Sequence, residues 1–189
     1  MKSCSSTLFQ KLYALAAIGL LAACGPMTDL KNPKSYQLEG LSFQYPKNWN
    51  LEEEPIAKGS HALTITTPGN GLVILQLYPV KIAQNLMGYA EEMAEAAAVA
   101  IPFAKVSESK FTKVEEWEDY TWTSEKFDIT LLGETRPHYR LYRSKDIDGH
   151  RLFLVLQSTF KDAGQLVAGL DMIAKSLEFA EGAQSAEAK

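Results

Sequence analysis

The stretch from Leu72 to Leu77, LVILQL, constrains the fold of this chain more than any other. Five of its six residues are large and apolar, so it lacks the alternation of a strand that has one face in water. The turn-forming cluster Pro68–Gly71 joins it to a second strand-like run, as in a β-hairpin. We therefore predict paired strands at His61–Thr66 and Leu72–Tyr78, near the centre of a sheet that is covered on both faces.

Two segments have the spacing of amphipathic helices, in which apolar residues recur every three or four positions. The first is predicted to end at Pro102, and the second to begin with Asp162 as N-cap and Gln165 in capping-box relation to it. One apolar stripe on each helix suits two layers that cover the two faces of a sheet. The stripes are Leu86, Ala90, Met93, Ala97 and Ile101 in the first helix, and Leu166, Leu170, Ile173 and Leu177 in the second.

The remaining segments read mainly as strands. Leu41–Tyr45 alternates and stops at a proline, as a strand does. Asp146–Gly149 is typical of a hairpin turn. Further strands are predicted at about residues 104–115, 120–132, 136–144 and 151–160. The predicted fold class is α+β, a largely antiparallel sheet flanked by helices in an α/β/α sandwich.

The segment Phe43–Trp49, FQYPKNW, resembles the F-x-Y-P-x-x-W opening of the PsbP-like superfamily. Physically, a strand delivers Phe43 and Tyr45, Pro46 turns the chain, and Trp49 folds back as a large apolar plug. The order of elements agrees over about residues 36–179. The resemblance implies the α/β/α sandwich and its strand order.

Members of that superfamily include the extrinsic photosystem II subunit, a Ran-binding nuclear import factor and bacterial envelope lipoproteins. The resemblance implies an adaptor or assembly subunit, without a shared catalytic motif. A fold does not carry a function with it, so neither photosystem nor Ran binding follows.

The amino-terminal residues are typical of a secretory signal. Lys2 and Lys11 precede an uncharged run, residues 12–23, that is shorter than the roughly 20 residues of a membrane span. Leu21–Cys24, LAAC, resembles a bacterial lipobox, so Cys24 is the predicted lipidation site and would carry a diacylglycerol. An ordinary signal peptide with a nearby cysteine, or a buried apolar segment, is the alternative. Gly25 follows the cysteine. An Asp at this position would resemble the inner-membrane retention signal of enteric bacteria, so its absence favours the outer membrane, with the domain facing the periplasm.

We therefore divide the chain into a signal peptide (1–23), a lipidated tether (24–35), a PsbP-like domain (36–180) and a disordered tail (181–189). Removal of residues 1–23 leaves 17 basic and 23 acidic residues, a formal charge of −6. Such an acidic chain argues against nucleic acid or an anionic membrane as its main partner. With Cys4 removed and Cys24 acylated, no free thiol would remain for a disulfide or a metal.

A first candidate site is basic. Arg136, His138 and Arg140 alternate, so a strand places them on one face. They could bind an anionic ligand or the acidic surface of a partner. Cross-strand ion pairs with the chain's own acids are the alternative.

A second candidate site is aromatic. Trp117, Tyr120 and Trp122 lie among four acidic residues of the segment 115–119. Aromatic rings beside acids can hold cationic or sugar-like ligands, or anchor a protein interface. Half-buried strand aromatics are the alternative.

The other motifs point away from catalysis. Asp146, Asp148 and His150 could surround a cation, but the further oxygen ligands of an EF-hand loop are missing, which favours a solvated turn. The sequence contains no H-E-x-x-H, G-x-S-x-G or G-x-G-x-x-G pattern. We predict no catalytic residue, no metal and no cofactor.

The predicted function is a membrane-anchored envelope lipoprotein, attached through the diacylglycerol on Cys24, with a non-catalytic domain that binds an envelope protein as adaptor or assembly factor. A small-molecule or ion-binding protein is the first alternative, and a cryptic hydrolase the second.

Overall fold

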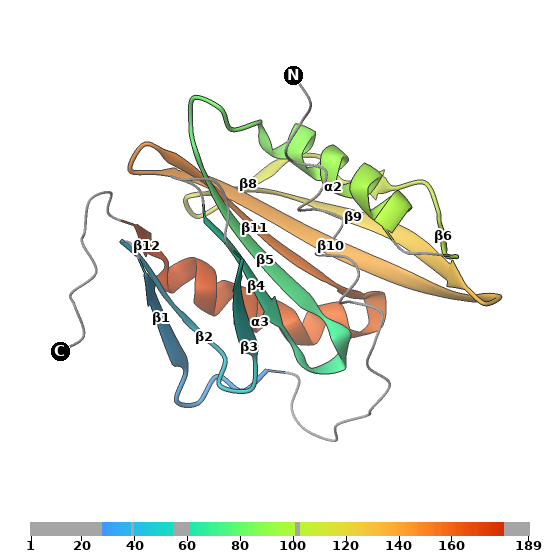
Figure 1. Ribbon diagram of the computed structural model, residues 1–189, viewed down its shortest axis with the longest axis horizontal. Helices are drawn as coiled ribbons and strands as arrows, with labels where there is room; N and C mark the ends of the chain where they lie inside the picture. Colours follow the sequence, from blue (N-terminus) through green and yellow to red (C-terminus); the bar gives the residue numbers. More distant parts are fainter. Residues whose placement is uncertain (1–27, 39, 55–60, 101–102, 180–189) are drawn as a thin grey trace.

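The computed structural model describes residues 28–38, 40–54, 61–100 and 103–179 (Figure 1). The predicted signal peptide, Cys24 and the predicted tail lie outside the described residues, as do Ile101 and Pro102. Neither described helix is long and apolar enough to cross a membrane.

An antiparallel sheet of nine strands forms the body of the described part, in the order β3-β4-β5-β11-β10-β9-β6, with β7 and β8 also paired to β9. The predicted central strand is confirmed, because β5 lies between β4 and β11 and its residues 72–77 are all buried. The strands are β3 (Asn50–Glu54), β4 (His61–Thr66), β5 (Leu72–Pro79), β6 (Lys105–Val106), β7 (Lys110–Phe111), β8 (Glu115–Trp117), β9 (Tyr120–Leu131), β10 (Glu134–Ile147) and β11 (His150–Thr159).

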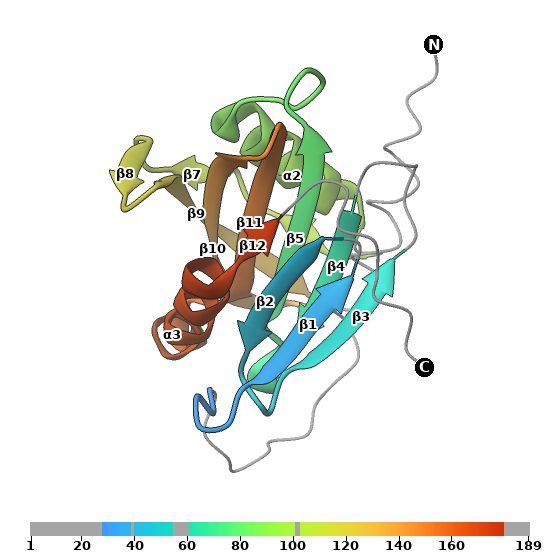
Figure 2. The ribbon, with the colours of Figure 1, turned by 90° about the vertical axis from the view of Figure 1, so that its left-hand side faces the viewer.

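Two layers cover the faces of this sheet, which confirms the predicted α+β class (Figures 1 and 2). Helix α2 (Leu86–Ala100) packs its predicted stripe on one face, around Phe153 and Tyr142. Helix α3 (Phe160–Ser176) packs on the other face, together with a small sheet of β1 (Lys34–Leu38), β2 (Leu41–Tyr45) and β12 (Glu178–Phe179).

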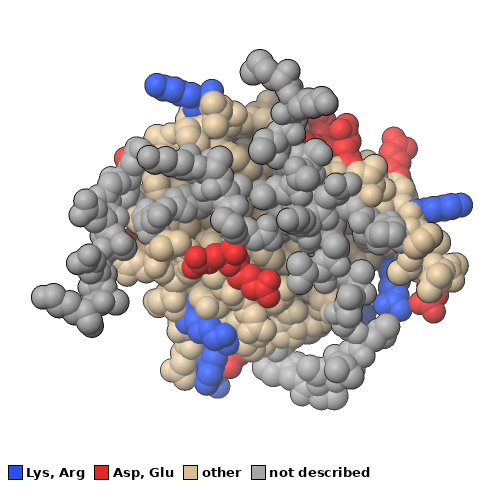
Figure 3. Space-filling model, in the orientation of Figure 1, with Lys and Arg blue, Asp and Glu red and all other residues tan. Residues whose placement is uncertain are grey.

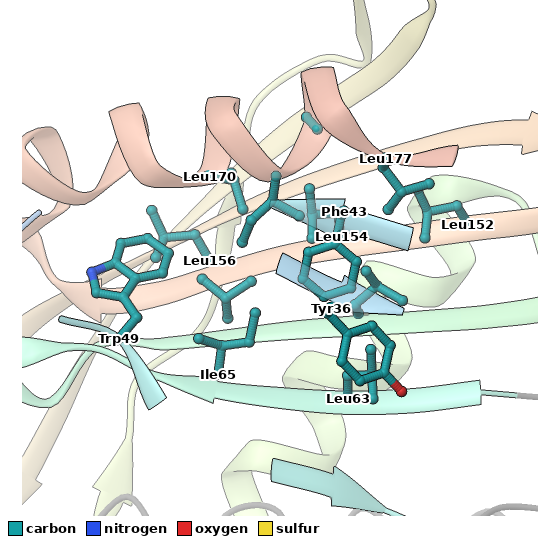
Figure 4. Close-up of a cluster of buried hydrophobic side chains, with 14 of the residues drawn as sticks. Tyr36, Phe43, Trp49, Leu63, Ile65, Leu152, Leu154, Leu156, Leu170 and Leu177 are labelled. Carbon is teal, nitrogen blue, oxygen red and sulfur yellow. The ribbon is translucent and has the colours of Figure 1, made fainter. Parts of the chain in front are cut away.

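Trp49 occupies the core beneath α3, as the sequence predicts (Figure 4). Its backbone N–H donates to the carbonyl of Pro46 at 3.1 Å, which closes the turn after β2. The indole fits because α3 has Gly169 there. A Cβ on that glycine would lie 2.3 Å from the indole carbon Cη2 of Trp49 and 2.9 Å from Cγ of Pro46.

Two predicted elements differ from the structure. Residues 104–115 do not form one strand. They contribute β6, β7 and the start of β8, because the backbone N–H of Asp128 donates to Oγ of Ser107 at 2.8 Å, a side-chain bond that replaces part of the ladder. Helix α3 begins at Phe160, because β11 runs directly into it. Its N-cap is Thr159, whose hydroxyl donates to Oδ2 of Asp162 at 2.7 Å.

The ends of the domain also differ from the prediction. Strand β1 begins at Lys34, within the segment assigned to the tether, and pairs with β2 along its whole length. Ahead of it, Oγ1 of Thr28 donates to the carbonyl of Gln165 at 2.7 Å. Residues 28–35 therefore lie against the domain. The predicted turn 146–149 is confirmed as a hairpin but is tighter, with only Asp148 and Gly149 outside the strands, both at positive φ.

Candidate functional site

A buried polar cluster lies on the face of the sheet that α2 covers. Nη1 of Arg140 donates to Oε1 and Oε2 of Glu125 at 3.1 and 2.8 Å, and its Nε donates to Oε1 of Gln157 at 2.6 Å. The Arg140 and Glu125 side chains are 1% and 0% exposed. The carboxylate satisfies the guanidinium inside the core, as a buried charge requires.

Further groups complete this cluster around Glu125. The hydroxyl of Tyr142 donates to its Oε2, and Oγ of Ser109 donates to its Oε1 at 2.5 Å. The guanidinium of Arg140 also lies 4.2 Å from the ring centroid of Phe127. Burial raises the pKa of Tyr142 well above its ordinary value, so its hydroxyl remains a donor at neutral pH. The cluster joins the segment just before β7 to β9, β10 and β11, and its role is structural.

Arg136, His138 and Arg140 share one face of β10, but the structure corrects the expectation of a three-residue surface patch. Arg140 lies in the core, because Glu125 is its partner on the neighbouring strand. Arg136 is exposed and pairs with Glu134 at 3.0 Å. His138 is half-buried, and burial, reinforced by the two arginines, lowers its pKa despite a hydrogen bond between Nδ1 and the carbonyl of Arg136.

His138 instead lines a small cleft of about 450 Å³ with residues of β7, β9 and α3. Lys110 and Lys126 lie directly opposite each other across β7 and β9 at this cleft. The ammonium of Lys126 is 5.0 Å from the ring centroid of Phe160, which is half exposed. Like charges in facing positions disfavour the strand pair, so this position suits an anion.

The aromatic cluster already holds cations that belong to the chain. The guanidinium carbon of Arg143 lies 4.0 Å from the ring centroid of Trp117, and the ammonium of Lys175 lies 5.5 Å from it. Lys145 is likewise 4.6 Å from the ring centroid of Tyr120. Trp122 packs against the core beneath α3. These contacts favour the interpretation as half-buried strand aromatics over that of a cation-binding site.

The turn between β10 and β11 provides no cation site. Arg151 makes two hydrogen bonds with Asp146, at 2.6 and 2.8 Å, and these bonds lower the pKa of that carboxyl. His150 is buried, with its ring against Phe179 and its Nδ1 3.0 Å from the carbonyl of Asp148. Among the described residues, no group of three or more potential ligands could hold a metal ion.

An acidic cleft of about 720 Å³ lies where the start of α2, the β8–β9 turn and the end of the β10–β11 hairpin meet. Apolar side chains of Leu86, Met87 and Val114 lie beside acidic ones, and Val114 is 45% exposed. Its two basic residues are engaged, since Lys145 pairs with Asp119 at 3.1 Å and Arg151 pairs with Asp146. The acids that line it are Glu116, Glu118, Asp119 and Asp146.

On the face shown in Figure 3, the described basic and acidic side chains form small, separate groups. Sequence reasoning noted the acids of segment 115–119 but missed this cleft, because segments far apart along the chain create it.

Comparisons with known proteins were made for sequence and for structure. No protein-family model matches the chain, and no curated protein matches it. Among solved structures, cyanobacterial PsbP (CyanoP) from Synechocystis sp. PCC 6803 is similar at 8% identity and a TM-score of 0.51, covering 86% of this chain and 99% of that one. LpqN, involved in cell envelope biogenesis of Mycobacterium tuberculosis, gives 12% identity and a TM-score of 0.39, covering 82% of this chain and 99% of that one. The likeness to CyanoP covers most of both chains, and with its antiparallel sheet and two helices the protein has a PsbP-like fold.

Proposed function

We propose that the protein is a lipid-anchored component of a bacterial envelope, whose PsbP-like domain binds another protein and catalyses no reaction of its own.

 The observation that carries the proposal is the lining of the acidic cleft, in which apolar and acidic side chains lie together. Such a mixed surface suits a protein segment that brings apolar and basic side chains. The lipobox-like LAAC ending at Cys24 supports the anchor.

The state of the titratable groups supports a non-catalytic role. A general acid or base has to reach its substrate within hydrogen-bond distance. Glu125 is fully buried and is engaged by Arg140 and Tyr142. In the acidic cleft, Asp119 and Asp146 are held in ion pairs with Lys145 and Arg151. These groups stabilise the fold and leave exposed acids, such as Glu116, for a partner.

The test is crosslinking in intact cells that produce the full chain, followed by affinity purification and mass spectrometry. The cleft variant is Val114→Arg with Glu116→Arg, and the matched control is Glu52→Arg with Glu53→Arg on β3, where both side chains are exposed. We expect one enriched envelope protein with the unsubstituted chain and with the control, and its loss with the cleft variant. Equal recovery with both variants contradicts the cleft as the binding site, and the lack of any enriched protein contradicts the adaptor function.

The cleft that His138 lines favours one alternative function, the binding of a small anion. Its facing lysines, Lys110 and Lys126, carry like charges that a bound anion would compensate. A ligand that binds only the native state raises the melting temperature. We expect pyrophosphate to raise it for the unsubstituted chain and not for Lys126→Gln. An equal shift in both would contradict an anion site at this cleft.

A further inference from the structure

The most exposed apolar side chains of the described residues gather at one end of the sheet. Phe103 is 95% exposed and Leu132 is 91% exposed, and Leu131 beside it is 38% exposed. Strand β6 pairs with β9 through Lys105 opposite Thr130. Phe103 precedes Lys105 by two residues and Leu132 follows Thr130 by two, so both lie near the same end of the β6–β9 pair. We call Phe103, Leu131 and Leu132 the apolar tip.

The backbone at the apolar tip is unfavourable for the residues it carries. Leu132 has φ 52° and Gly133 has φ 86° in the two-residue turn between β9 and β10, and Phe103 has φ 64°. Left-handed backbone favours glycine or asparagine and is strained for a larger side chain. Two large apolar side chains are therefore held in water on backbone that suits neither. Local strain of this kind points to a function outside the folding of the domain.

The shape and charge of this end suit a lipid surface. Leu131 ends β9 and Leu132 lies in the turn to β10, at the end of a hairpin that forms one end of the sheet in Figure 1. A projecting point buries little area against a flat protein surface but can enter the headgroup layer of a bilayer. The exposed charged residues of segments 103–111 and 126–136 sum to +1, whereas the whole chain carries −4, so anionic lipids do not repel this end. They are Lys105, Lys110, Lys126 and Arg136 against Glu108, Asp128 and Glu134.

We propose that the apolar tip inserts into the headgroup layer of the same bilayer that holds the lipid anchor, and so fixes the orientation of the domain at the membrane. This inference rests on the anchoring at Cys24 that forms part of the proposed function. The acidic cleft at the start of α2 is then left free for a protein partner.

The position of the first described residues is compatible with this arrangement. Thr28 follows Cys24 by four residues, which span at most about 14 Å, and it is bound to the carbonyl of Gln165 in α3. Gln165 lies five residues, or about 7.5 Å, along α3 from its first residue, Phe160. The ring of Phe160 contacts Lys126 on β9. From there the tip is six strand residues away, about 20 Å.

The experiment uses the full chain reconstituted into vesicles of phosphatidylethanolamine and phosphatidylglycerol. A solvent-sensitive fluorophore is attached at Leu132→Cys, or for the control at Ile82→Cys, a 71% exposed position in the loop between β5 and α2. The chain without either substitution corrects for fluorophore that is bound non-specifically. We expect lipids with a nitroxide near the headgroup to quench the label at position 132 several-fold more than the label at position 82.

A second variant separates membrane contact from folding. With the label moved to Phe103→Cys, Leu132→Asn should reduce lipid quenching without lowering the melting temperature, because asparagine tolerates the positive φ. Equal quenching at positions 132 and 82 on vesicles that retain the chain overturns the inference and leaves the anchor intact. A chain that does not stay with the vesicles contradicts both. Crosslinking through position 132 to a second copy or to another protein, without lipid quenching, overturns the inference in favour of that partner.

Discussion

Nη1 of Arg140 lies 2.8 Å from Oε2 of Glu125 in a part of the core where neither side chain is more than 1% exposed. The two residues face each other across β10 and β9. The sequence predicts Arg140 on a basic strand face, whereas in the structure it forms a buried ion pair with Glu125.

Breaking this pair should strongly destabilise the fold. Arg140→Met leaves Glu125 as a buried charge without its cation, and such a change costs about 3–5 kcal/mol of unfolding free energy. The matched control is Arg136→Met, which removes an exposed pair with Glu134 and should cost about 1 kcal/mol or less. Denaturant unfolding measures both. Similar losses in the two variants would show that the buried pair adds no special stability.

The plug formed by Trp49 makes a second prediction. Gly169→Ala would place a Cβ 2.3 Å from the indole, and overpacking of this kind costs about 1–3 kcal/mol. Gly164→Ala in the same helix meets nothing within 4 Å and should instead stabilise by up to about 1 kcal/mol through helix propensity. Thermal unfolding of the two variants should therefore give shifts of opposite sign. A stabilised Gly169→Ala variant would contradict the close contact between the helix and Trp49.

The turn between β9 and β10 should gain stability when its apolar residue is replaced. Leu132→Asn relieves the strain of a leucine at φ 52° and should raise the unfolding free energy by about 1 kcal/mol. Leu131→Asn, which lies within β9, should give no such gain. Denaturant unfolding compares them. Equal effects of the two changes would mean that the backbone of Leu132 stores no strain.

His138 should make stability depend on pH. Burial lowers its pKa in the folded state below the ordinary value of 6.5, so the unfolded chain binds a proton more readily. The contribution of the neutral ring is present above pH 6.5 and is lost as the pH falls through that value toward the lower, folded pKa. His138→Asn should weaken this acid-side loss, as measured by denaturant unfolding from pH 7.5 to 5. An NMR titration of His138 with a midpoint above 6.5 would refute the prediction.

The anchor has a direct test. Cys24→Ser should abolish incorporation of labelled palmitate and release the protein from membranes, because two or more acyl chains are what makes such an anchor stable. Cys4→Ser should change neither, since residue 4 would be removed with the signal peptide. Palmitate incorporation in both variants would locate the acylation elsewhere.

Much of the fold could be read from the sequence because it follows from local patterns. Residues close together in the sequence were enough to predict the apolar run of β5, the periodic stripes of α2 and α3, and the turn at Gly149. The family resemblance carried by the motif Phe43–Trp49 predicted the overall architecture. The division of segment 104–115 into short strands was not predictable, because a side chain of Ser107 replaces ladder bonds only once β9 lies beside it.

The sites depended on tertiary structure to a much greater degree. The sequence by itself determined which residue types are available, such as the alternating Arg136, His138 and Arg140. Only the packing of β9 against β10 decided that Arg140 meets Glu125 in the core while Arg136 remains in water. Pairing energies of charges depend on burial and on neighbours distant in the chain, and these quantities exist only after the strands have assembled.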